Sequence, residues 1–153
     1  MVIFRIISVL FTAIAFAPGF AHLLERKPKL DLSRSDYLIT QQLYAGWALF
    51  GIIIFIALIA TVIVAIRTKW RMEKILAWSA AILIVTSLVL FFIHIYPANQ
   101  QTFNWSFLPD NWIELQQQWE DTHALNAILY GMALLLLIIS LAIRKQVNIS
   151  ERS

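Results

Sequence analysis

Four long hydrophobic runs, separated by polar segments, dominate this chain. They cover approximately residues 2–24, 43–66, 75–96 and 124–143. Each is about as long as the roughly 20 residues that an α-helix needs to cross a hydrocarbon core of about 30 Å. The pattern therefore predicts an all-α integral membrane protein. We expect a single four-helix transmembrane domain over residues 1–153, with the lipid bilayer as its surroundings.

The composition agrees with this pattern and narrows the range of functions. Hydrophobic residues make up 60% of the chain and charged residues only 14%, which excludes an ordinary soluble domain. The chain contains no cysteine, so disulfide and thiol chemistry are excluded as well.

The charged residues are distributed unevenly over the polar segments, and Lys and Arg mark the cytoplasmic side of membrane proteins. One predicted face holds eight basic and two acidic residues: Arg5, Arg67, Lys69, Arg71, Lys74, Arg144, Lys145 and Arg152, with Glu73 and Glu151. The other face holds four basic and seven acidic residues: Arg26, Lys27, Lys29 and Arg34, with Glu25, Asp31, Asp36, Asp110, Glu114, Glu120 and Asp121.

This asymmetry predicts cytoplasmic termini and outward loops at residues 25–41 and 97–123. The expected location is the bacterial inner membrane. Because the net charge of +3 follows from the topology, it gives no reason to expect nucleic acid as a partner.

The predicted fourth helix, residues 111–144, begins outside the membrane. Pro109-Asp110-Asn111 is a typical helix start, and no proline follows it before residue 144. A row of side chains at spacings of three and four residues, here called the polar stripe, lies on one face of this helix. It consists of Trp112, Gln116, Trp119, His123, Asn126 and Tyr130. Polar groups are costly in lipid, so we expect the stripe to face the bundle interior.

The predicted first helix has a matching face of small and polar residues: Ser8, Thr12, Ala15, Gly19 and His22. Pro18 is expected to bend this helix just before His22. The predicted third helix contributes His94 and ends at Tyr96-Pro97. All three histidines of the chain therefore lie at the outer end of the bundle, which is where we expect a functional site.

Three functions are compatible with such a site. The first is acid–base chemistry on a flat lipophilic molecule, without a cofactor, by a histidine that Glu120 or Glu25 orients. The second is a metal ion or haem bound by His22, His94 and His123, although their spacing matches no ligand motif. The third is a non-catalytic accessory subunit, with a membrane complex or a second copy as its partner.

The chain also resembles the anthrone oxygenase-like family of small membrane proteins. The similarity rests on Pro97-x-Asn99, on Asp110-x-Trp112, on Trp119-Glu120-x-x-His123-Ala124-x-Asn126, and on Phe20-Ala21-His22 in the first helix. Together with the four-helix layout, it involves essentially the whole chain.

The family is named after fungal and bacterial members that oxidise an anthrone to an anthraquinone with molecular oxygen and need no metal or flavin. The resemblance therefore implies deprotonation of an activated carbon, followed by reaction of the carbanion with oxygen. It implies His123 as the base, with His22 as second choice. It also implies substrate-binding roles for Asn99, Trp112, Trp119 and Asn126. Two further candidates come from their predicted position alone: Tyr130 lies on the polar stripe, and His94 lies at the outer end of the bundle.

Overall fold

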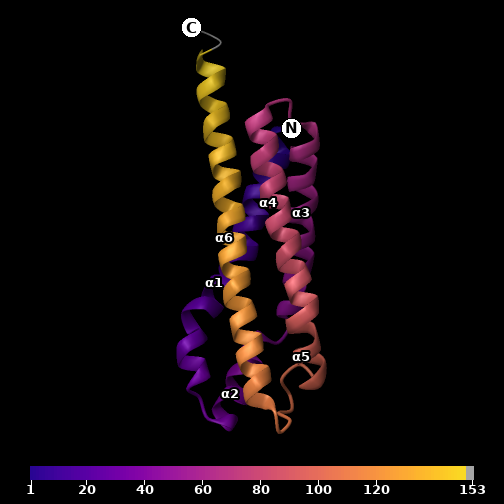
Figure 1. The fold of residues 1–153 in the computed structure, drawn as a ribbon, viewed down its shortest axis with the longest axis vertical. Helices are drawn as coiled ribbons and strands as arrows, with labels where there is room; N and C mark the ends of the chain where they lie inside the picture. The colour runs from indigo at the N-terminus through magenta and orange to yellow at the C-terminus, as the bar shows by residue number, and fades with distance from the viewer. Residues whose placement is uncertain (151–153) are drawn as a thin grey trace.

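The computed structural model describes the backbone of residues 1–150 and the side chains of residues 1–143. Its four long helical segments are antiparallel to their neighbours in sequence (Figure 1). They are α1 (Val2–Leu30), α3 (Phe50–Arg67), α4 (Arg71–Leu90) with its continuation, and α6 (Trp112–Ser150). Helix α1 packs against α3 and α6, and α4 packs against the same two helices, which gives a square bundle.

Each of the four segments is long and apolar enough to cross a membrane. The interior contains mainly small residues, among them Ala15, Ala57, Ala60, Ala77, Ala80, Ala81, Ala127 and Ala133, while large residues such as Ile52, Phe55 and Ile59 are exposed. Small side chains let helix backbones approach closely in a membrane. At Gly19, a Cβ atom would lie only 3.3 Å from the Cα atom of Ala127. The prediction of an all-helical bundle with four apolar helices is confirmed.

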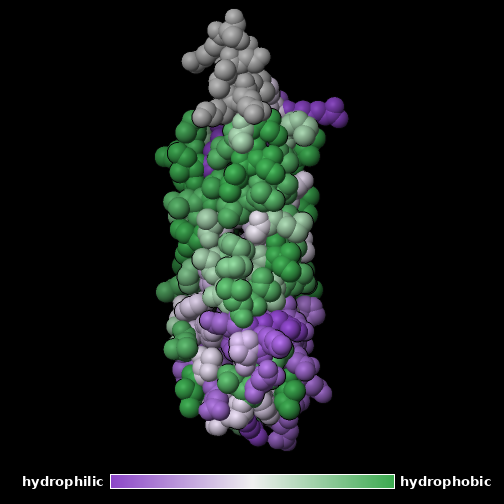
Figure 2. All heavy atoms as spheres, turned by 90° about the vertical axis from the view of Figure 1, so that its left-hand side faces the viewer, coloured by the Kyte–Doolittle hydropathy of each residue, from purple (hydrophilic) through white to green (hydrophobic). Residues whose placement is uncertain are grey.

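The two ends of the bundle differ. The N-terminus of α1 lies at the same end as the C-terminal part of α6, whereas α2 (Arg34–Gln41) and α5 (Tyr96–Gln101) lie at the opposite end (Figure 1). Figure 2 shows hydrophobic side chains over most of one face and hydrophilic ones near this opposite end. We call the latter the polar end. It has its own small core, which includes Tyr37, Ile95, Trp105, Leu108 and Trp119.

The first two predicted helices have different bounds in the structure. Helix α1 continues beyond residue 24 to Leu30, and residues 34–41 form α2 instead of loop. The predicted helix 43–66 begins only at Phe50, because Gly46 adopts a left-handed φ of 84° that no helix continues through. Two short 3₁₀ turns, η1 (Gln42–Tyr44) and η2 (Trp47–Leu49), occupy the connection.

The prediction that the third helix ends at Tyr96-Pro97 is also wrong. A π-helical segment, η3 (Phe91–Ile95), joins α4 to α5, and the Tyr96 N–H bonds to the Phe91 carbonyl five residues back. Proline lacks the N–H that a continuous α-helix needs and clashes with the preceding turn. The wider π turn accommodates Pro97, so the helical path continues to Gln101.

Two charges assigned to the basic face are buried instead. Arg5 Nε lies 2.5 Å from Glu73 Oε1, and the Thr68 hydroxyl donates to the other carboxylate oxygen of Glu73. Arg5 and Glu73 are 6% and 3% exposed. Opposite charges compensate one another here, and the pair ties the start of α1 to the α3–α4 turn.

Candidate functional site

The polar stripe of α6 faces the bundle interior, as predicted. Gln116, Trp119, Asn126 and Tyr130 are buried, and Trp112 and His123 are half-buried. The matching face of α1 is also interior, with Ser8, Thr12, Ala15 and His22 buried. Facing stripes on two contacting helices are what brings His22 and His123 together.

The rings of His22 and His123 stack at a centroid distance of 4.4 Å and an interplanar angle of 28°. Trp119 packs against both, 4.9 Å from His22 and 4.1 Å from His123. Tyr44 and Trp47, from η1 and η2, lie 4.5 and 5.8 Å from His22. The histidine pair is thus enclosed by aromatic rings from three parts of the chain.

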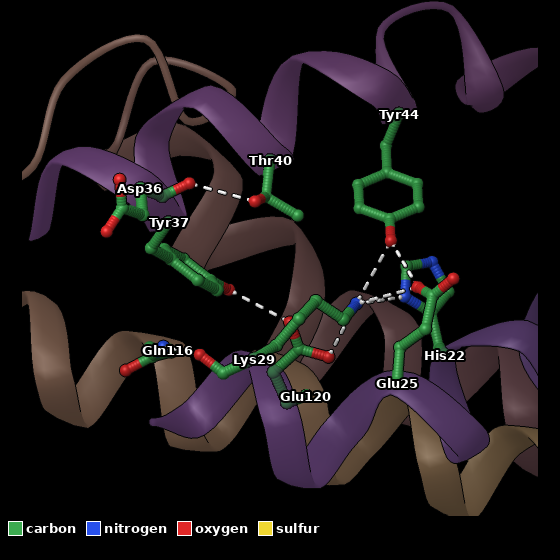
Figure 3. A network of polar contacts seen from close by, with 9 residues as sticks. All are labelled: His22, Glu25, Lys29, Asp36, Tyr37, Thr40, Tyr44, Gln116 and Glu120. Atoms are coloured by element: carbon green, nitrogen blue, oxygen red, sulfur yellow. Dashed lines mark hydrogen bonds and ion pairs between the residues drawn. The ribbon is translucent and has the colours of Figure 1, made fainter. Parts of the chain in front are cut away.

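Lys29, at the end of α1, is the centre of the polar network (Figure 3). Its Nζ atom lies 2.9 Å from His22 Nδ1 and 3.0 Å from Glu120 Oε2. The same atom lies 3.2 Å from the Tyr44 hydroxyl and 3.5 Å from Glu25 Oε2. Although Lys29 was counted among the charges of the outer loops, it is only 4% exposed. A lysine is buried in this way only when opposite charges and acceptors surround it.

Glu120 is fully buried, and a second element holds it in place. The Tyr37 hydroxyl of α2 donates to Glu120 Oε1 over 3.2 Å. Burial, and then the nearby Glu120, raise the pKa of Tyr37 above its ordinary value. Burial, and then the hydrogen bond to Glu25, raise the pKa of Tyr44 in the same direction. Both phenols therefore keep their protons and act as donors to the two carboxylates.

Asn99 positions Trp119. Its Oδ1 atom accepts hydrogen bonds from Trp119 Nε1 at 2.9 Å and from Trp105 Nε1 at 3.0 Å. Residues 103–105 all have positive φ, which is unfavourable for side chains of their size. The Asn104 N–H to Asn99 carbonyl bond of 2.7 Å and the burial of Trp105 hold this turn. Asn99 therefore acts through the tryptophan ring that covers the histidine pair.

His94 and Trp112 do not join this cluster. His94, in η3, is half-buried, and among the described side chains its ring contacts neither His22 nor His123. Trp112 packs against Tyr37 with ring centroids 6.1 Å apart. The described residues contain no group of three His, Asp or Glu side chains placed to hold a metal ion. Of the three predicted metal ligands, His22 and His123 are thus in contact, and His94 lies apart from them.

Eight buried side-chain atoms of the described residues have no hydrogen-bond partner, and two of them belong to neighbouring residues of the polar stripe: His123 Nε2 and Asn126 Oδ1. These residues lie three positions apart on α6 and therefore on one face. Buried polar atoms without partners are rare, and at a functional site they are candidates for contact with a ligand. Tyr130 lies one turn further along the same stripe.

A groove of about 510 Å³ lies beside the pair on the outside of the bundle. It is open along its length, and all its lining residues are apolar: Ala13, Ile14, Ala17, Pro18, Ala21, Trp47 and Phe50. Trp47 lines the groove and also packs against His22, so this side chain connects the groove with the histidine pair.

No family model, curated protein or solved structure matches the chain. Membership of the anthrone oxygenase-like family therefore stays a prediction, and the function is inferred from the site itself.

Sequence reasoning missed Lys29, Tyr37 and Tyr44. The signal for Lys29 was present, because it follows His22 by seven residues and so lies on the same face of a continuous helix. The predicted end of the first helix at residue 24 hid this relation. For Tyr37 no local signal existed, since its role depends on α2 folding back onto α6.

Proposed function

We propose that this protein is an integral membrane enzyme that deprotonates an activated carbon of a flat lipophilic substrate and oxidises it with molecular oxygen. His123 is the base, and His22 is its partner. In this proposal the termini are cytoplasmic, the protein lies in the bacterial inner membrane, and the polar end faces outward, as the distribution of Lys and Arg favours.

One observation carries the proposal: the unpartnered, buried Nε2 atom of His123 beside a charged network. A neutral imidazole nitrogen with a free lone pair is the commonest general base in enzymes. The unpartnered Oδ1 atom of Asn126 lies on the same face and can accept a hydrogen bond from a phenol hydroxyl of the substrate. The ammonium group of Lys29 lies 2.9 Å from His22 Nδ1, on the ring that stacks against His123.

The reaction balances without a cofactor. His123 takes a proton from a CH₂ group that aromatic rings and a carbonyl activate, and the carbanion reduces oxygen to a bound peroxide. Return of the proton gives a hydroperoxide, and loss of water from it leaves a ketone. One CH₂ group and one O₂ molecule therefore become one C=O group and one water molecule.

The apolar groove supports a substrate that arrives from the bilayer. Its volume falls within the range of small-molecule sites, and its lining has no polar side chain. We propose that Trp47 moves aside to admit the substrate to the histidine pair. Gly46, directly before it, has the left-handed backbone that makes this connection a suitable hinge.

Oxygen consumption by the purified protein in lipid nanodiscs, with anthrone as the probe, tests the activity. We expect His123→Gln to lower the rate by a factor of about 100 or more, because general-base catalysis contributes about 10²–10⁴. His94→Gln is the matched control and should keep the wild-type rate. No anthraquinone from the wild type, or equal rates for both variants, would refute the proposal. A Soret band or one equivalent of metal in the active protein would favour the metal or haem alternative.

Cysteine labelling tests the proposed orientation. Asn104→Cys and Lys69→Cys change exposed residues at opposite ends of the bundle. A membrane-impermeant maleimide added to intact cells should label the first variant only. Labelling of Lys69→Cys alone would reverse the assigned sides.

A further inference from the structure

Lys29 makes more contacts than a structural ion pair requires. An ammonium group has three N–H donors and no acceptor. Its Nζ atom has four acceptors within reach: His22 Nδ1, Glu120 Oε2, the Tyr44 hydroxyl and Glu25 Oε2. The Tyr44 hydroxyl already donates to Glu25. The three lysine protons therefore go to His22, to Glu120, and to the Tyr44–Glu25 pair.

This donor count determines the state of His22. Because Lys29 only donates, Nδ1 of His22 must accept, and the proton of the neutral imidazole lies on Nε2. His22 then has an N–H donor at Nε2, while Nε2 of His123 has no hydrogen-bond partner. The two stacked rings consequently have different roles, one as donor and one as base.

We propose that Lys29 is a positioning residue that holds His22 in its Nε2–H tautomer and thereby leaves His123 as the base. This inference rests on the proposed function. Lys29 touches neither the reacting atoms nor the groove and acts through His22.

The charges around Lys29 suit a site that takes up a proton. The titratable and charged groups that face it are His22 and Glu25 from α1, Tyr44 from η1, and Glu120 from α6, with Tyr37 of α2 behind Glu120. With both histidines neutral, two carboxylates and one ammonium leave one net negative charge. When His123 takes up the substrate's proton, the net negative charge of this network compensates the positive charge of the imidazolium.

The same network leads from the pair to the surface. The side chain of Lys29 is 5% exposed, whereas that of Glu25 is 47% exposed. The contact between Lys29 and Glu25 therefore connects the buried His22 with the surface at the polar end.

Solution NMR of protein with ¹⁵N-labelled histidine tests this inference without any substrate. Couplings between the ring nitrogens and the carbon-bound ring protons identify the tautomer. We expect wild-type His22 to carry its proton on Nε2 and to have an unprotonated, hydrogen-bonded Nδ1. Lys29→Met should give a mixture of tautomers, Lys29→Arg should keep the wild-type form, and Lys27→Met, at an exposed position two residues away, should change nothing.

A proton on Nδ1 of His22 in the wild type would overturn the inference, even if Lys29→Met failed to fold. An unchanged tautomer in folded Lys29→Met would overturn it equally. With anthrone, Lys29→Met should lower kcat by about 10- to 100-fold with little change in KM, and Lys29→Arg should restore part of it. If the wild type does not oxidise anthrone, the proposed function fails, but the tautomer measurement still decides the role of Lys29.

Discussion

Replacing Glu120 with glutamine is the sharpest test of the buried network. The carboxylate is fully buried, accepts from Tyr37 and pairs with Lys29. Glu120→Gln keeps the size of the side chain and an oxygen that can accept from Tyr37. It removes the negative charge, so that Lys29 faces either the amide NH₂ group or the amide oxygen, which is a weaker acceptor than a carboxylate oxygen.

The structure sets the size of the effect. Removing one partner of a fully buried ion pair costs about 3–5 kcal/mol. Here Glu25 remains 3.5 Å from Lys29 but is half-exposed, so it compensates in part. We therefore expect Glu120→Gln to lower the free energy of unfolding by about 2 kcal/mol, close to the value of one charge-assisted hydrogen bond.

Reversible unfolding in mixed detergent micelles, followed by tryptophan fluorescence, measures this loss. Glu114→Gln, at an exposed site on the same helix, is the control and should stay within about 0.5 kcal/mol of the wild type. In a double-mutant cycle with Lys29→Met, the double variant should be more stable than the two single losses predict, with a coupling of about 1–3 kcal/mol. Additive losses, or a Glu120→Gln variant as stable as its control, would refute the ion pair.

Three further changes follow from the packing and the hydrogen bonds, each with a measurement of the unfolding free energy. Gly19→Leu should lower the free energy of unfolding by about 1–3 kcal/mol, because a Cβ atom there already meets the Ala127 backbone. The control Gly51→Leu, with open space around it, should change this free energy little, and equal losses in the two variants would contradict the close approach of α1 and α6. Asn99→Ala leaves two buried indole N–H groups without an acceptor and should therefore lower the free energy of unfolding by about 2–4 kcal/mol. It should also shift the tryptophan emission, whereas the control Gln101→Ala, at an exposed position, should not. Because the pKa of Tyr37 is higher in the folded than in the unfolded chain, the protonated phenol stabilises the fold fully below about pH 10, and this contribution is lost as the pH rises towards the folded-state pKa. Between pH 9 and pH 11, the free energy of unfolding of the wild type should therefore fall by about 1.4 kcal/mol more than that of Tyr37→Phe. Equal losses in these two proteins would mean that the Tyr37 phenol is not buried.

The four apolar helices and the inward faces of α1 and α6 were predictable from the sequence. Both depend on local properties: the length of a hydrophobic run and the recurrence of polar residues every three or four positions. The stripe that contains Trp119, His123 and Asn126 is interior for this reason. The ends of the helices were less predictable, because the π turn before Pro97 and the left-handed Gly46 depend on how neighbouring segments pack.

The sequence by itself determined that His22 and His123 belong to one level of one bundle. Only the tertiary structure decided that their rings stack, that His94 stays apart, and that Lys29 is buried between Glu25 and Glu120. The physical reason is that periodicity assigns a residue to a face of its own helix, whereas burial of a charge depends on compensation by residues from other elements. A lysine that appears in the sequence as one more charge in a polar loop thus becomes the centre of the site when α1, η1 and α6 meet around it.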